Sequence, residues 1–186
     1  MVENRIGHRY AKSAFELAEE QGNLDQVHGD MGLFLEVYEQ NRDFRDMLQS
    51  PIVNLDAKQK IIDRIFGSHF KSELMTTLVA LVVRKNREMY LPEVAQSFLS
   101  LYDEVKGIAR GTIESAIPLS DQQVKAIQET LEKSTGKRFE LTEEVNPELI
   151  GGFLLKVGDT QFDGSVVSAL RRAKQQLLKG AVNTNS

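Results

Sequence analysis

The sequence contains no cysteine, so disulfide bonds, thiolate metal sites and a cysteine nucleophile are all excluded. Tryptophan is absent too, and there are only three histidines, His8, His28 and His69. None of them has a second histidine three or four positions further on, whereas a zinc site needs three or four convergent ligands. We therefore expect no metal site, no cofactor and no catalytic residues in this chain.

Long apolar stretches are also missing. The longest run, Leu78 to Val83, is far short of the roughly 20 residues that a membrane span needs, and the N-terminus lacks the apolar region of a signal peptide. This predicts a soluble chain that is not secreted through such a signal. The formal net charge is -4, so the chain has no excess of positive charge for binding nucleic acid, and we expect no nucleic-acid partner.

The composition is that of an ordinary globular protein, with 41% hydrophobic and 27% charged residues among 186. A compact fold of this size buries roughly 70% of the surface of its unfolded chain, so it needs no covalent cross-links. Adjacent carboxylates such as Glu19 and Glu20 diverge on a helix, which favours a solvated surface over acid-base catalysis.

Apolar residues recur at helical spacing through the first half of the chain. Between Ile6 and Glu20 the apolar and small residues occupy a sector of about 180°, wider than the stripe of about 100° that a core-facing helix needs. A second helix follows Gly22 and Asn23, and a third one ends before Pro51. The surplus apolar surface of the first helix either joins the core or receives a partner helix.

Three more helices complete this half. Asn54 or Asp56 caps the fourth, and Gly67 is expected to end it in a left-handed conformation. The fifth covers about residues 72–84, and the sixth carries Pro92 in its first turn, where a missing N–H has no cost.

Beyond Gly107 the spacing at which apolar residues recur changes from the 3.6 residues of a helix to the two residues of a strand. Ile113, Ser115 and Ile117 alternate with their neighbours and predict a strand that ends at Pro118. The letters SDQQ at 120–123 form a capping box, which opens a helix that ends at Gly136. Further strands are expected around Phe139 to Val145, Phe153 to Val157, and Gln161 with Phe162, before a closing helix that starts at Ser165.

The fold class is therefore mainly α: a six-helix bundle over residues 1–106, followed by a small α+β module over residues 107–186. On the closing helix Arg171, Arg172, Lys174 and Lys179 gather. They either complement the helix C-terminus or form a docking surface for an acidic partner.

The stretch NPELIGGFLLKVGDTQFDGSV, residues 146–166, has the composition of a phosphate site. The P-loop signature is absent, because Gly158 is followed by Asp159 and not by the required lysine. The dinucleotide-binding fingerprint is also absent, because Gly151 and Gly152 precede a strand instead of opening a helix after one. We interpret the block as a strand, a tight turn and a helix start. The residues that form this structural signature are Gly151, Gly152, Gly158, Asp159, Asp163, Gly164 and Ser165. A stand-alone nucleotide-binding protein that uses block 151–164 is the alternative.

Four segments together resemble the delta subunit of F-type ATP synthase, whose mitochondrial counterpart is the oligomycin sensitivity conferral protein. They cover nearly the whole chain in the family's order: HRYAKSAFELAEEQG, YLPEVAQSFLSLYDEVKG, IESAIPLSDQQ and LIGGFLLKVGDTQFDGSVVSALRRAKQQL. The resemblance implies a connector without an active site, located on the cytoplasmic face of a bacterial cell membrane as part of the complex.

In that family the bundle grips the N-terminal helices of alpha subunits, and the C-terminal module binds the b subunits of the peripheral stalk. The stalk holds the catalytic head still, so that proton flow remains coupled to ATP synthesis. The family's groove for an alpha-subunit helix lies between the first and fifth helices. The resemblance transfers this groove to Tyr10, Ala14, Leu78, Leu81 and Val82.

One departure from the family is visible. Members often carry Asn-Gly-Arg after the fifth helix, where this chain has Lys85, Asn86 and Arg87. Asparagine tolerates the left-handed conformation less well than glycine but better than most residues, so we expect a turn there.

Overall fold

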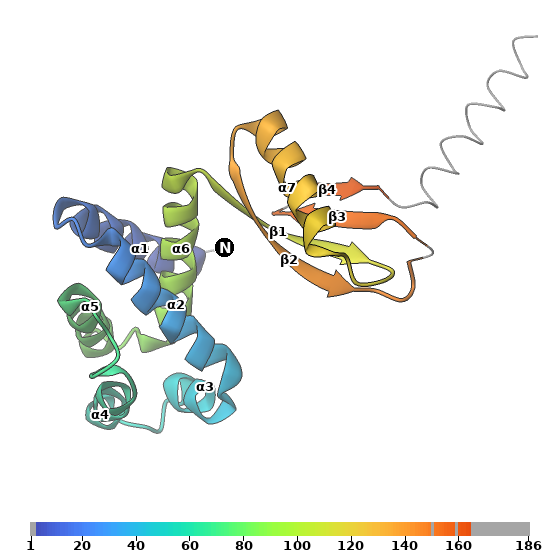
Figure 1. The fold of residues 1–186 in the computed structure, drawn as a ribbon. Helices are drawn as coiled ribbons and strands as arrows, with labels where there is room; N and C mark the ends of the chain where they lie inside the picture. The colour runs from blue at the N-terminus through green and yellow to red at the C-terminus, as the bar shows by residue number, and fades with distance from the viewer. Residues whose placement is uncertain (1–2, 150, 159, 165–186) are drawn as a thin grey trace, which may run out of the picture. The chain divides into compact units, whose positions relative to one another are not determined.

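The computed structural model describes residues 3–149, 151–158 and 160–164, and the chain divides into two compact units, Met1–Val105 and Lys106–Ser186. We call these the N-terminal unit and the C-terminal module (Figure 1). The described part is mainly helical with one small sheet, which confirms the predicted fold class. The N-terminal unit contains α1 (Glu3–Glu20), α2 (Leu24–Gln40), α3 (Arg42–Gln49), α4 (Leu55–Phe66), α5 (Glu73–Arg84), the 3-10 helix η1 (Glu88–Tyr90) and α6 (Leu91–Lys106), whose last residue belongs to the C-terminal module.

The N-terminal unit has one hydrophobic core to which all its α-helices contribute. A group of four phenylalanines forms one part of it, with Phe66 of α4 lying 5.5 Å from Phe34, 5.7 Å from Phe44 and 4.9 Å from Phe70 between ring centroids. Phe15 of α1 contacts Phe98 of α6 at 5.5 Å. Aromatic pairs such as these, which are tilted, edge-to-face or stacked, contribute about 0.5–1.5 kcal/mol each beyond the burial of their area.

The helix ends follow their sequence signals with one exception. The Asn54 side chain accepts a hydrogen bond from the Ala57 N–H at 2.8 Å, so Asn54 rather than Asp56 caps α4. Gly67 has a φ of -57°, so the predicted left-handed stop there is wrong. The chain continues in right-handed turns, in which the N–H groups of His69 and Phe70 bond to the Phe66 carbonyl.

At the end of α5 a residue does take the left-handed conformation, since Asn86 has a φ of 57°. The Asn86 N–H donates to the Val83 carbonyl at 2.8 Å and the Arg87 N–H donates to the Val82 carbonyl at 3.0 Å. These two bonds are those of a Schellman motif, in which glycine usually occupies the position of Asn86. The expected turn is thus present with asparagine.

The C-terminal module is a four-stranded sheet in the order β2-β1-β3-β4, with one described helix, α7. Strand β1 pairs with β2 in parallel and with β3 antiparallel, and β3 pairs with β4 antiparallel. Helix α7 makes the crossover that a parallel pair requires. The elements are β1 (Ile108–Ser115), α7 (Asp121–Thr135), β2 (Arg138–Val145), β3 (Phe153–Val157) and β4 (Thr160–Asp163).

The capping box of α7 is confirmed: the Ser120 hydroxyl accepts from the Gln123 N–H, and the Gln123 side chain accepts from the Ser120 N–H at 2.9 Å. Gly136 ends the helix with a φ of 70°, as predicted. The Gln128 side chain donates to the Phe139 carbonyl at 2.7 Å, which fixes α7 to β2.

The first strand differs from its prediction. It begins at Ile108 and ends at Ser115, and Ile117 is 72% exposed instead of continuing the buried face of Ile113. The reason is local, because the Ser115 hydroxyl donates to the Ile117 carbonyl at 2.7 Å and bends the chain before Pro118. The closing helix predicted from Ser165, with its cluster of basic residues, lies outside the described residues.

Candidate partner-binding site

Helix α1 presents two different strips of small and apolar residues. The inner strip packs closely: Ala11 and Ala18 are fully buried, and a side chain added to Gly7 would lie 2.7 Å from the Cβ of Glu93 on α6. The outer strip remains partly at the surface, with Tyr10 half-buried and Leu17 40% exposed. The core therefore uses only part of the apolar sector that the sequence shows.

The five residues assigned to the groove divide in the same way. Ala14, Leu78 and Val82 are 3%, 7% and 0% exposed and belong to the hydrophobic core. Tyr10 and Leu81 retain more accessible surface. A helix that binds here would contact Tyr10 and Leu81, whereas the other three would support the site from the core.

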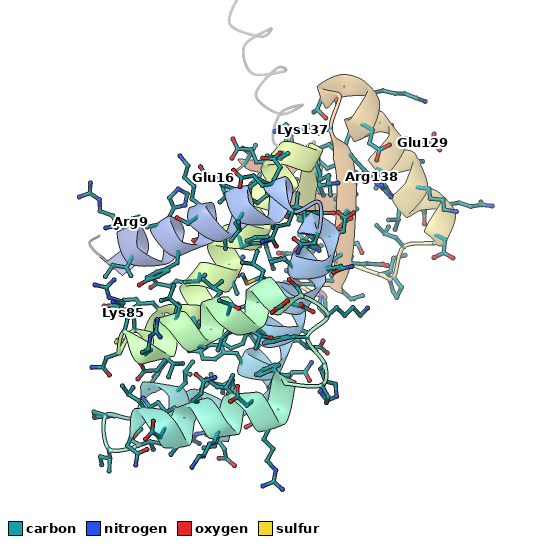
Figure 2. All side chains as sticks on the ribbon, turned by 90° about the vertical axis from the view of Figure 1, so that its left-hand side faces the viewer. Arg9, Glu16, Lys85, Glu129, Lys137 and Arg138 are labelled. Carbon is teal, nitrogen blue, oxygen red and sulfur yellow. The ribbon has the colours of Figure 1, made fainter. Side chains whose placement is uncertain are left out.

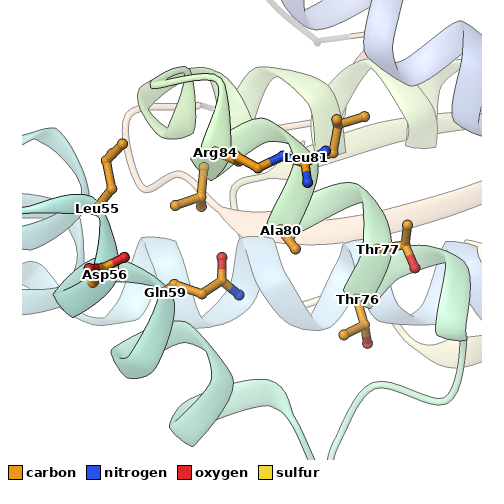
Figure 3. Close-up of a pocket in the computed structure, with 9 residues that line it drawn as sticks. Leu55, Asp56, Gln59, Thr76, Thr77, Ala80, Leu81 and Arg84 are labelled. Carbon is orange, nitrogen blue, oxygen red and sulfur yellow. The ribbon is translucent and has the colours of Figure 1, made fainter.

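Leu81 also lines a pocket between α4 and α5 with a volume of about 640 Å³ (Figure 3). Asp56 and Gln59 face it from α4, and Thr76 and Ala80 face it from α5. The lining combines apolar and neutral polar groups with one carboxylate and the guanidinium group of Arg84. The surface of α5 is therefore hollowed on the side that faces α4.

A second pocket, of about 360 Å³, lies at α1 and is lined by Ile6, Arg9, Tyr10, Ser13 and Arg87. Nη1 of Arg87 donates to the Tyr10 hydroxyl at 3.1 Å, and the Arg87 guanidinium carbon lies 6.0 Å from the centroid of the Tyr10 ring. Arg9 projects from the same end of the unit as Lys85 (Figure 2). We call this cavity the arginine pocket.

The position of Arg87 depends on its neighbours. Asn86 turns the chain at the end of α5, and Glu88 anchors the following turn through a buried ion pair with Lys58 of α4 at 2.6 Å. Nζ of Lys58 also donates to the Leu48 carbonyl at 2.9 Å. Sequence reasoning missed Arg9, Ser13 and Arg87 as site residues. The only signal was the departure at residues 85–87, which revealed a turn but not the cavity it borders.

The glycine-rich block has backbone roles in the described residues. Gly152 and Gly158 have φ values of 79° and 54°, so Gly158 takes a left-handed conformation directly after β3. Gly151 has a φ of 154°, and a side chain added to Gly164 would lie 3.3 Å from the Phe153 ring. Asp163 pairs with Leu154 in the sheet, whereas Asp159 and Ser165 lie outside the described residues.

A charged pair lies on the sheet at β1 and β3. The Lys156 ammonium donates to the Glu114 carboxylate, and Asn146 donates to the other carboxylate oxygen at 3.2 Å. The hydrogen bond from Lys156, with a smaller one from Asn146, lowers the pKa of Glu114, and the same bond to Glu114 raises the pKa of Lys156. Each group stabilises the charged form of the other, which is typical of a structural ion pair.

Among the residues that the structure describes, no three histidine or acidic side chains gather as metal ligands would. Within the same ranges, no helix has both the length and the apolar character needed to cross a membrane.

Comparison with known proteins decides the family. The model of the ATP synthase delta (OSCP) subunit family matches residues 6–177. The chain belongs to this family. It is 35% identical over 180 residues to the ATP synthase subunit delta of Geobacter metallireducens, an alignment that covers 97% of this chain and all of that protein. The corresponding subunit of Symbiobacterium thermophilum is 34% identical over 183 residues, which are 98% of each chain.

The structure of the mitochondrial ATP synthase hexamer of Toxoplasma gondii contains a chain that matches with a TM-score of 0.72 at 27% identity. That match covers 92% of this chain and 97% of the other. Membership in the delta (OSCP) family makes the chain a structural subunit of an ATP synthase complex, in its peripheral stalk, and not a catalytic one.

Proposed function

We propose that this chain is the stator subunit that links the catalytic F1 head to the F0 membrane sector, so that proton transport stays coupled to ATP synthesis. The N-terminal unit binds the N-terminal helix of an alpha subunit, and the C-terminal module binds the b subunits. The chain reaches the membrane only through the complex, on the cytoplasmic face of a bacterial cell. Family membership over nearly the full length supports this assignment.

The proposal that the N-terminal unit binds the F1 head rests on the outer strip of α1. Its members Ile6, Tyr10, Ser13 and Leu17 follow spacings of four, three and four, so they align along one line of the helix surface. Three of the four are apolar and none is buried completely. An amphipathic helix that lies along this strip and over Leu81 would bury apolar area on both partners, as helix-in-groove complexes do.

A binding experiment with the full chain tests this. A synthetic peptide of about 20 residues from the alpha-subunit N-terminus, roughly 30 Å long as a helix, is titrated by calorimetry. We expect saturable binding that Tyr10→Asp weakens by at least about tenfold, because the change removes the aromatic ring whose apolar surface the partner helix would bury.

The matched control is Ile52→Asp, which makes the same kind of change at a side chain that is 91% exposed in the loop between α3 and α4. This variant should bind the peptide as tightly as the unmodified chain. Far-UV circular dichroism checks that both variants keep their helices. Tight binding of the peptide by a folded Tyr10→Asp variant would show that the partner helix does not bind along α1.

Coupling itself is tested by reconstitution. Membranes from which the native delta subunit has been removed leak protons through F0 and lose ATP synthesis if the stator role is right. Adding the full chain should restore both, whereas adding the Tyr10→Asp variant should restore neither at equal concentration. Restoration of synthesis by that variant would show that the head is held through another surface.

A further inference from the structure

The arginine pocket is an unusual cationic feature on a chain with a net charge of -4. Two arginines, Arg9 and Arg87, line one cavity of about 360 Å³ together with Tyr10, Ser13 and Ile6. Among the side chains that the structure describes, no carboxylate lies within salt-bridge distance of Arg9 or Arg87. The cationic groups of the pocket are therefore not neutralised within the described part of the chain.

The nearby carboxylates of Glu88 on η1 and Glu93 on α6 form no ion pair with either arginine of the pocket. Glu88 pairs with Lys58 in the interior. Glu93 packs against Gly7, and its buried Oε2 has no hydrogen-bond partner among the described residues, so it does not bond to Arg9 or Arg87. The bond from Arg87 to Tyr10 fixes one edge of the guanidinium group, which has five donors in all. The remaining donors of Arg87 stay available for an oxyanion, and the planar group binds a carboxylate through two parallel hydrogen bonds.

We infer that the arginine pocket binds an acidic side chain of the partner helix and thereby fixes the register of that helix along α1. The inference rests on the proposed function, because the ligand is carried by the helix that occupies the groove. Ile6 and Tyr10 belong both to the outer strip of α1 and to the pocket lining, so the apolar site and the cationic site are continuous. A helix that buries its apolar face on the strip would bring a flanking Asp or Glu to Arg9 and Arg87.

A tethered carboxylate fits this site better than a free anion does. Both arginines are exposed, and salt screens the attraction of an exposed charge for a small ion in solution. A carboxylate on a helix that is already bound is held at a high effective concentration, so the same two guanidinium groups suffice to bind it.

The test is a double-mutant cycle between the full chain and the alpha-subunit peptide, read as dissociation constants. Arg87→Gln and Arg9→Gln are each titrated with the unmodified peptide and with peptides in which one Asp or Glu at a time becomes the amide. We expect Arg87→Gln to weaken binding about five- to tenfold at low salt, and less at high salt. One amide peptide should lose a similar factor, and combining the two changes should cost little more than either alone.

Two further variants make the reading specific. Arg64→Gln removes the same charge from the exposed surface of α4 and should leave the peptide affinity unchanged. Arg87→Lys keeps the charge but loses the planar fork, so it should recover only part of the affinity. The exposed positions of Arg9 and Arg87 let these variants fold, which circular dichroism verifies.

The outcomes separate the two proposals. If the peptide binds but neither arginine variant weakens it, the arginine pocket does not hold a carboxylate, while the groove assignment stands. Equal losses for Arg87→Gln and Arg64→Gln would mean a general field effect and would also overturn the pocket. If the unmodified chain does not bind the peptide at all, both the groove and the pocket assignments fail.

Discussion

Lys58 and Glu88 form an ion pair whose side chains are only 3% and 8% exposed, and the pair ties α4 to η1. The Nζ–Oε1 distance is 2.6 Å, and Lys58 donates a second bond to the Leu48 carbonyl. The other Glu88 carboxylate oxygen has no hydrogen-bond partner among the described residues. Removing Lys58 would therefore leave a buried carboxylate with no compensating contact.

The change to make is Lys58→Met, which keeps an unbranched side chain only one atom shorter and removes the charge. Breaking a buried pair by removing one partner costs about 3–5 kcal/mol, and the Leu48 carbonyl loses a bond that contributes about 1 kcal/mol. Replacing both partners, as Lys58→Met with Glu88→Leu, removes the uncompensated charge as well. We expect the double variant to lie within about 2 kcal/mol of the unmodified chain.

Intrinsic fluorescence provides an assay that reports on the N-terminal unit alone. The chain has no tryptophan, and its four tyrosines, Tyr10, Tyr38, Tyr90 and Tyr102, all lie in that unit. Urea unfolding followed by tyrosine emission gives the free energy of unfolding of the unit for each variant. A loss below about 1 kcal/mol for Lys58→Met, or a double variant as unstable as the sum of the single ones, would refute the reasoning.

Three other predictions concern turns and charge. Asn86→Ala should lower the free energy of unfolding by about 1 kcal/mol in the same assay, because alanine resists the left-handed conformation that Asn86 adopts. Asn86→Gly should cause no such loss, and equal losses in both variants would show that the backbone conformation is not the cause. Gly158→Val should destabilise the C-terminal module by about 1 kcal/mol or more, seen as faster hydrogen exchange of β3 and β4 amides, since its φ is 54°; unchanged exchange would contradict this. The pKa of Glu114 is lowered mainly by its hydrogen bond from Lys156. The pair therefore stabilises the folded module at a pH above the usual pKa range of a glutamate, and this stabilisation is lost as the pH falls toward the lowered pKa. NMR-monitored urea unfolding of β1 at neutral and acidic pH should therefore show a weaker dependence on pH in Glu114→Gln, and an identical dependence would rule the pair out.

Much of the fold was readable from the sequence because its signals are local. A capping box joins Ser120 to a residue three positions away, and the period of the apolar residues reports a helix or a strand within a few turns. The errors arose where a local signal had two outcomes. A glycine such as Gly67 adopts a right-handed or a left-handed backbone conformation equally well. The alternation of apolar residues up to Ile117 did not show that the Ser115 hydroxyl would bend the chain.

Local patterns in the amino-acid chain are enough to predict the helices, the change from a helical to a strand period, and an apolar sector on α1 that is too wide for a core. The packing of the helices sets which part of that sector stays at the surface, since Ala14 is buried and Tyr10 is not. Packing also brings Arg87 to Tyr10 across 77 positions and Lys58 to Glu88 across 30. Such pairs depend on how separate helices pack, and no periodicity or cap within one helix encodes the distance between two of them.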